Sequence, residues 1–201
     1  MMKSSLIIFF FCLSLFGFSQ EKFDILSVER FQKEMNQEFS DSIKSPLTSA
    51  DRAHFKGLDF FPISEHFFVI AQFVRTKKEK PLEMKTSTNR KPLYVKYGEV
   101  FFSIDGKDFK LNVYRSIDLS KKKEYKDDLF LPFSDLTSGK ESYIGGKYMD
   151  LKIPKGNTIA LDFNTSYNPY CAYNHKYSCP IVPLENDLDI EIKAGVKKFH
   201  D

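Results

Sequence analysis

Apolar residues recur every three or four positions near the start of the chain, and every second position along much of the remainder. Residues 24–44 carry charged side chains opposite the apolar ones, so their spacing predicts an amphipathic helix. Its apolar face would consist of Ile25, Val28, Phe31, Met35, Phe39 and Ile43. Asp24 or Ser27 can cap the start, and Ser45-Pro46 can end the helix. A short second helix is expected from Ser49.

After Pro62 the pattern is typical of β-strands, rich in aromatic and β-branched residues. Strands are predicted at 66–76, 91–97, 99–104, 112–117, 148–153, 158–163 and 188–194. They are separated by turn signals at regular intervals, which indicates antiparallel pairing. We therefore predict a mainly β fold, either a sandwich or an open barrel, with one or two N-terminal α-helices packed on it.

The clearest local prediction is a β-hairpin across Asp105-Gly106, a pair that tolerates positive φ at both turn positions. Pairing outward from this turn places Ile104, Phe102 and Val100 opposite Lys107, Phe109 and Leu111 on one face. The other face then carries the pairs Ser103/Asp108, Phe101/Lys110 and Glu99/Asn112. A shift of one residue would mix the two faces, so the pattern specifies this register.

The first 19 residues have the layout of a secretory signal peptide, with Lys3, an apolar run over residues 6–18, and small residues before Gln20. The run is shorter than the ~20 residues that a membrane-spanning helix needs. We therefore expect no stable membrane insertion after cleavage near Ser19-Gln20, and a periplasmic or extracellular protein. Cys12 lies inside the apolar run, which argues against a lipid anchor.

The mature chain is long enough for a sizeable core. We divide it into an N-terminal helical segment, 20–48, and a single β-rich domain, 49–201. The full chain has 30 Lys and Arg against 27 Asp and Glu, and its short lysine runs are followed by acids. Without a concentrated basic face, we expect no nucleic-acid partner.

Familiar catalytic and cofactor motifs are missing from the sequence. It has no Gly-x-Gly-x-x-Gly, no complete phosphate loop, no Gly-x-Ser-x-Gly and no His-Glu-x-x-His. The four histidines are scattered, and none has a partner that spacing identifies. We therefore predict neither a cofactor nor a metal.

Two loops carry the candidate chemistry, 133–148 and 164–179. Hydroxyls, acids, a lysine and glycines lie among tyrosines there, as a pocket with apolar walls and a few polar groups requires. The same residues can also serve only to hold loop backbones in place. The predicted ligand-binding residues are Thr137, Tyr143, Tyr148, Asn164, Asn168 and Tyr173.

Four passages carry a resemblance to a known family. They are PLTSADRAHFKGLDFFP, TSTNRKPLYVKYGEVFFSIDG, FLPFSDLTSGKESYIGGKYMDLKIP and LDFNTSYNPYCAYNHKYSCPIVPLEN. Together they resemble the bacterial family called domain of unknown function 1684, over roughly residues 45–195. The resemblance implies no established activity, cofactor or substrate. The family favours Arg where Lys147 stands, which weakens an anion-binding role for that lysine, because Lys lacks the planar fork of Arg.

Cys171 and Cys179 are the cysteines that remain after cleavage, and in an oxidising compartment such a pair most simply forms a disulfide. Loop closure would then contribute about 2.5 kcal/mol. A zinc site with His175 would need a helix, which Pro169 and Pro180 oppose. A role as reactive thiols stays open, because members that resemble this chain keep both cysteines even where they lack an export signal.

We consequently expect an exported β-rich module that binds a small molecule, glycan or peptide through the two loops. The alternatives are a hydrolase, with Asp135, Glu141 or Asp162 as acid or base and Lys147 as electrostatic stabiliser, and a structural or accessory protein of the cell envelope. The sequence indicates neither the ligand nor the oligomeric state.

Overall fold

The computed structural model describes residues 21–200, so the predicted signal peptide, its cleavage point and Cys12 lie outside the described residues. Two α-helices come first, α1 (Ile25–Ser40) and α2 (Ser49–His54). The strands are β1 (Phe68–Arg75), β2 (Leu82–Glu83), β3 (Leu93–Ile104), β4 (Lys107–Ser116), β5 (Asp128–Asp135), β6 (Lys147–Lys152), β7 (Thr158–Asp162) and β8 (Asp187–Leu188). No helix within residues 21–200 combines the length and the apolar character of a membrane span.

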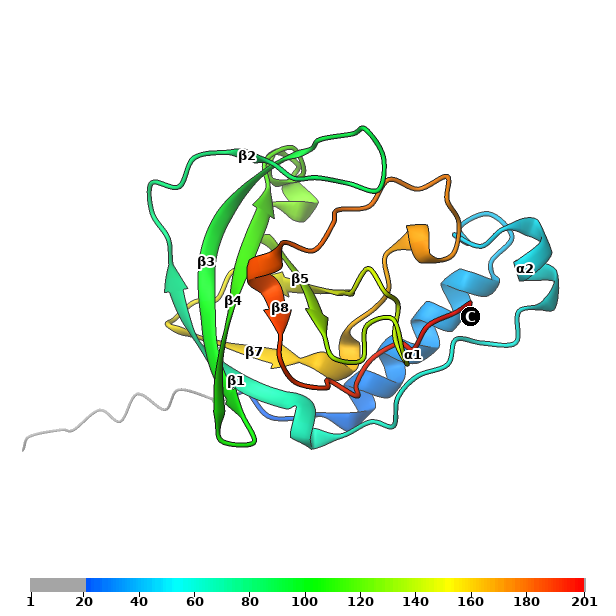
Figure 1. Ribbon diagram of the computed structural model, residues 1–201, viewed down its shortest axis with the longest axis horizontal. Helices are drawn as coiled ribbons and strands as arrows, with labels where there is room; N and C mark the ends of the chain where they lie inside the picture. Colours follow the sequence, from blue (N-terminus) through cyan, green and yellow to red (C-terminus); the bar gives the residue numbers. More distant parts are fainter. Residues whose placement is uncertain (1–20, 201) are drawn as a thin grey trace, which may run out of the picture.

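The strands form one curled sheet in the order β6-β5-β4-β3-β1-β7, with β2 added to β3 and β8 added to β5. All pairings are antiparallel except that of β8 with β5. The sheet curls into an open half-barrel, and α1 runs beside it (Figure 1). β6 and β7 are consecutive in the chain, yet they lie at opposite edges of the sheet. The prediction of a mainly β fold with an open barrel and a packed N-terminal helix is confirmed.

The predicted hairpin is confirmed residue by residue, from Ile104 opposite Lys107 to Glu99 opposite Asn112. Asp105 and Gly106 both have positive φ, 53° and 73°. The two strands predicted at 91–97 and 99–104 are one strand, β3, with a register shift between Lys96 and Gly98. A Cβ atom at Gly98 would come within 2.6 Å of the Phe73 ring, so the close pairing of β3 with β1 requires glycine there.

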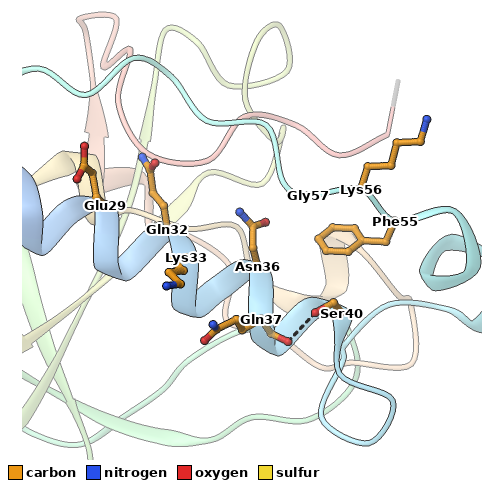
Figure 2. A pocket seen from close by; sticks show the side chains of 9 residues that line it. All are labelled: Glu29, Gln32, Lys33, Asn36, Gln37, Ser40, Phe55, Lys56 and Gly57. Atoms are coloured by element: carbon orange, nitrogen blue, oxygen red, sulfur yellow. Dashed lines mark hydrogen bonds between the residues drawn. The ribbon is translucent and has the colours of Figure 1, made fainter.

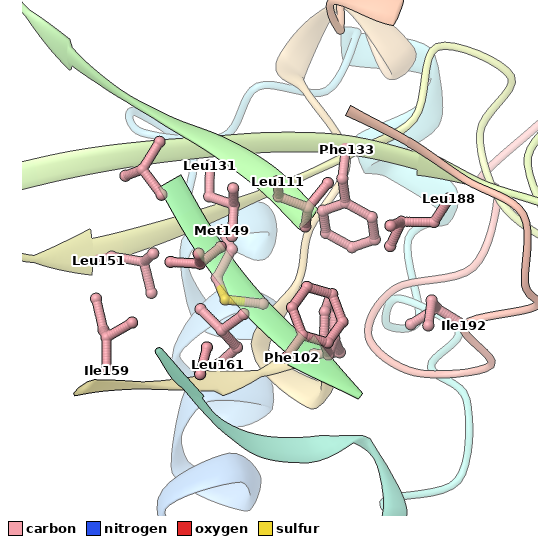
Figure 3. Close-up of a cluster of buried hydrophobic side chains, with 14 of the residues drawn as sticks. Phe102, Leu111, Leu131, Phe133, Met149, Leu151, Ile159, Leu161, Leu188 and Ile192 are labelled. Carbon is pink, nitrogen blue, oxygen red and sulfur yellow. The ribbon is translucent and has the colours of Figure 1, made fainter. Parts of the chain in front are cut away.

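The main core fills the inside of the curled sheet with alternate residues from β1 and β3 to β7 (Figure 3). Phe102, Leu111, Leu131, Phe133, Met149 and Leu161 contact one another there, and Leu188 and Ile192 close one end. A second cluster joins α1 to the loop after β7, because Phe39 packs with Leu47, Leu58, Tyr173 and Val196. This second cluster fixes the position of the loop that carries the cysteines.

The end of α1 differs from the prediction of a helix to residue 44. Asp24 caps the start as expected, with its carboxylate accepting the N–H of Leu26. The helix ends at Ser40, because the carboxylate of Asp41 accepts the backbone N–H groups of Ile43 and Lys44 at 2.7 and 2.8 Å. Ile43 is therefore carried outside the helix and is exposed.

Two strand predictions are corrected in the second half of the chain. β5 was not predicted, because it contains Pro132 and begins and ends with polar residues, which is not typical of a strand. The Pro132 carbonyl is bonded by a side chain, since Asn186 donates to it at 2.6 Å. The strand predicted at 188–194 ends at Leu188. No strand follows Leu188 within the described residues. The Ile190 carbonyl accepts the backbone N–H of Leu136 at 3.0 Å, and the N–H of Ile192 donates to the Asp135 carboxylate at 3.3 Å.

Candidate functional site

The two predicted loops meet at a pocket of about 480 Å³. The loop between β5 and β6 contributes residues Gly139, Ser142, Tyr143 and Ile144, and the loop after β7 contributes Cys171 to His175. Thr48 and Asp51 at the start of α2, and Lys198, Phe199 and His200 near the C-terminus, complete the lining. Four segments that are distant in the sequence thus converge on one cavity.

The first loop is wound around Thr137. The Thr137 carbonyl accepts the N–H groups of Lys140, Glu141 and Ser142 at 3.0 to 3.1 Å. The Thr137 hydroxyl lies 2.7 Å from the Ser142 hydroxyl. Thr137 is fully buried, and its own N–H donates to Asp135 at 2.8 Å. Its contacts show that it shapes the loop and does not face the pocket lumen.

Beneath this loop, Lys147 and Asp135 form a sealed ion pair. The ammonium lies 3.1 Å from Oδ2 of the carboxylate, in a geometry that falls short of a hydrogen bond, and both side chains are 0% exposed. Lys147 also donates to the carbonyls of Ile192 and Ala194 at 2.9 and 3.3 Å. Burial lowers the pKa of Lys147, and the charge of Asp135 opposes that shift. These contacts indicate that the pair positions the C-terminal segment.

The second loop is anchored by two buried asparagines. Asn164 exchanges hydrogen bonds with the backbone of Ser64, both at 2.9 Å, and donates to Asp162 at 2.7 Å. Asn168 donates to the carbonyl of Lys197 at 2.8 Å. Burial raises the pKa of Asp162, while the bonds from Asn164 lower it. The amides of both asparagines are therefore engaged in holding backbone together.

The remaining predicted acid, Glu141, is exposed and pairs with Lys193 at 3.3 Å. Asp135 is sealed from solvent, and Asp162 bonds to Asn164, so each candidate acid has a partner of its own. The contacts thus give these three carboxyls separate local roles, whereas an acid/base pair would face one open cleft.

Two of the predicted tyrosines differ in their surroundings. Tyr148 packs edge-on against Phe130, at 4.7 Å between ring centres, and its hydroxyl donates to the Pro180 carbonyl. It lies outside the pocket lining. Tyr173 is buried against Phe39, also edge-on at 4.7 Å, and it is one of the residues that line the pocket.

One thiol lies in the pocket wall, and the other lies next to it outside the lining. Both are buried and free, and the backbone N–H of Cys171 donates to Sγ of Cys179 at 3.2 Å. The predicted disulfide is not formed in this structure and stays a prediction. Cys171 lines the pocket, whereas Cys179 does not. Behind them, Ser87 Oγ accepts the N–H of Cys179 at 3.1 Å.

The thiols and Tyr143 influence one another's protonation. The hydrogen bond from Cys179, with smaller contributions from Ser87 and the Tyr143 hydroxyl, lowers the pKa of Cys171 to about 6. The same bond and burial raise the pKa of Cys179. Burial, followed by the charge on Cys171, raises the pKa of Tyr143 to about 12. At neutral pH the site therefore favours one thiolate at the pocket wall, bonded by neighbouring donors.

The sequence predicted the two loops, but it did not predict that residues of α2 and of the C-terminal segment also line the pocket. Thr48, Asp51, Phe199 and His200 line the pocket, and His200 Nε2 lies 3.7 Å from Asp51 Oδ2. Their only sequence signal is the capping pattern of Thr48 and Asp51 at α2. Within residues 21–200, no group of three or more His, Cys, Asp or Glu side chains is arranged to hold a metal ion.

A second hollow, of about 640 Å³, lies between the polar side of α1 and residues 55–57 (Figure 2). Asn36 accepts the N–H of Leu58 at 2.7 Å, and the Ser40 hydroxyl donates to the Gln37 carbonyl at 2.9 Å. Its lining comes from the solvent face of a helix, and neither of the predicted loops contributes to it. We therefore take the smaller pocket as the candidate site.

Comparison with known proteins adds a family and a fold. The family model described as "Protein of unknown function (DUF1684)" matches residues 53–197. A solution NMR structure of an uncharacterized protein from Haloarcula marismortui is 32% identical, with a TM-score of 0.67, covering 86% of this chain and 92% of that one. No curated protein matches the chain. Most of the chain is matched by the family model, and the protein belongs to the DUF1684 family.

Proposed function

We propose that the protein is a ligand-binding module whose site is the pocket between residues 139–144 and 171–175. The observation that carries the proposal is the convergence of both candidate loops, α2 and the C-terminal segment on one cavity. Its volume of about 480 Å³ falls within the range of small-molecule sites. A small polar molecule is the ligand class that fits this cavity best.

The lining has the composition that such a ligand needs. Tyr173, Phe199 and Ile144 supply apolar surface, and Tyr143, Asn174 and His200 bring polar groups to the same space. Aromatic walls with a few polar groups fix the orientation of a ligand. The separate roles of Asp135, Glu141 and Asp162 favour binding over the hydrolytic alternative.

A thermal-shift screen with small polar molecules tests the proposal, because a ligand that binds only the folded state raises the melting temperature. Tyr143→Ala should abolish the shifts given by wild-type binders. Tyr125→Ala is the matched control, since Tyr125 is 40% exposed and lies outside the pocket lining. Shifts that survive Tyr143→Ala at full size would overturn the proposal.

We also propose that the module acts outside the cytoplasm, on the basis of the signal-peptide pattern in residues 1–19. The mass of the protein recovered from its native host tests this directly. Export predicts a mature N-terminus at Gln20 and recovery outside the cytoplasm. An intact N-terminus on a cytoplasmic protein would contradict it.

A further inference from the structure

The two thiols differ in their access to the pocket. Cys171 forms part of the pocket wall, whereas Cys179 lies behind it against Ser87. Each is 8% exposed, so the pocket is the route by which a reagent can reach Cys171. A thiol–disulfide exchange pair requires this asymmetry, with one thiol that an outside reagent can reach and a second one within reach of the first.

Neighbouring groups also favour a thiolate at Cys171. The two cysteines are adjacent, with the backbone N–H of Cys171 donating to Sγ of Cys179 at 3.2 Å. Hydrogen bonding from Cys179, and to a smaller extent from the Tyr143 hydroxyl, lowers the pKa of Cys171 to about 6. Hydrogen-bond donors stabilise the charged form, and the thiolate is the nucleophilic form of cysteine. The hydrogen bond to Cys171 and burial raise the pKa of Cys179, so Cys179 keeps its proton while Cys171 is a thiolate.

The loop does not depend on a cysteine bridge for its position. The Arg90 guanidinium donates to the Ser178 carbonyl at 2.7 Å, and the N–H of Ile181 donates to the Lys85 carbonyl at 2.8 Å. Asn168 and the buried ring of Tyr173 hold the other end of the loop. These contacts leave the two sulfurs free to change their bonding while the loop keeps its place.

We propose that Cys171 and Cys179 form a thiol–disulfide exchange centre, in which Cys171 attacks a small disulfide that enters the pocket and Cys179 resolves the product. In the first step the Cys171 thiolate bonds to one sulfur of the disulfide and releases the other as a thiolate. In the second step Cys179 loses its proton to solvent and attacks Cys171, which releases the second small thiolate. The two cysteines are oxidised, and the small disulfide is reduced to two thiols.

Reaction of the fully reduced protein with glutathione disulfide tests this, with products read by intact mass and peptide mapping. Wild type should form the internal disulfide without a lasting adduct. Cys179→Ser should accumulate one glutathione at Cys171, and Cys171→Ser should react at least about tenfold more slowly. Reduced glutathione should reopen the wild-type disulfide. If a variant fails to fold, limiting iodoacetamide on reduced wild type serves instead, and it should label Cys171 first.

Three results would overturn the proposal. Cys179 could react as fast as Cys171, the reduced wild type could fail to react, or the internal disulfide could resist reduced glutathione while reduction lowers the melting temperature sharply. The last result would identify a structural disulfide. The assay reads covalent exchange with glutathione disulfide and not the binding of small polar molecules, so its failure leaves the proposed binding function to be judged by the thermal-shift screen.

Discussion

The ammonium of Lys147 lies 3.1 Å from the carboxylate of Asp135, with both side chains sealed from solvent. The pair joins the end of β5 and the start of β6 to the segment after β8, because Lys147 also donates to the carbonyls of Ile192 and Ala194. Removing one partner of a buried ion pair leaves an uncompensated charge in a low-dielectric site. The pair thus links the first pocket loop to the C-terminal wall.

Lys147→Met should lower the free energy of unfolding by about 3–5 kcal/mol, because it leaves the Asp135 carboxylate buried without a counter-charge. Urea denaturation measures the change. Lys107→Met is the matched control, since its pair with Asp189, at 2.7 Å, is exposed to solvent and should contribute little to stability. Equal losses in the two variants would show that the buried pair has no special role.

Gly146→Ala should destabilise the fold strongly. Gly146 has φ of +79°, and an added Cβ would lie 2.5 Å from the Phe133 carbonyl oxygen, which a strand holds in place. The strained backbone alone costs about 1 kcal/mol or more, and the clash adds to it. Gly156→Ala is the control, because its φ is ordinary and its surroundings are open. Thermal melts of the two variants should differ by several degrees.

The reduced protein should gain stability as the pH rises from about 6 toward the ordinary cysteine pKa of about 8.5. The folded state lowers the pKa of Cys171 to about 6, so in this window the unfolded state binds more protons. That stability is lost as the pH falls through about 6. Chemical denaturation across this range should show the gain in wild type and not in Cys171→Ser.

Tyr143→Phe should shift the pH midpoint of Cys171 alkylation upward, because it removes a hydrogen-bond donor to the Cys171 sulfur.

Two asparagines of the same loop should respond differently to truncation. Asn168→Ala removes the donor to the Lys197 carbonyl from a fully buried site, and should cost about 1–3 kcal/mol of stability. Asn174 lines the pocket and is only partly buried, so Asn174→Ala should alter ligand binding more than melting temperature. Denaturation and the ligand screen, run on both variants, check the contrast. Equal stability losses would place both side chains in the loop scaffold.

The sequence specified local pairing better than it specified contacts across the fold. The register of the 99–112 hairpin is set by alternation and a single turn, because both signals lie within a few residues. β5 was not predicted because it contains Pro132, which is unusual inside a strand. The Pro132 carbonyl is bonded by the side chain of Asn186, which is distant in the sequence. The segment after Leu188 has a strand-like pattern, yet its backbone bonds to the side chains of Asp135 and Lys147 and to single backbone groups such as the N–H of Leu136, which no local pattern reveals.

The candidate site was predictable as a pair of loops and not as individual residues. Tyr143, Cys171 and Tyr173 line the pocket as the loop prediction implies. Polar residues such as Thr137 and Asn164 have the same composition signal, yet they face inward, because a tightly wound loop must satisfy its own buried backbone groups. Composition alone does not separate residues that line a pocket from residues that support it.

The most direct test of the proposed binding site is a two-dimensional amide NMR spectrum of the protein, titrated with the small polar molecules that raise its melting temperature. We expect shift changes at residues 139–144, 171–175 and 198–200, and their loss in Tyr143→Ala. Shift changes centred on the hollow along α1, or shift changes at the pocket that persist in Tyr143→Ala, would contradict the proposed site.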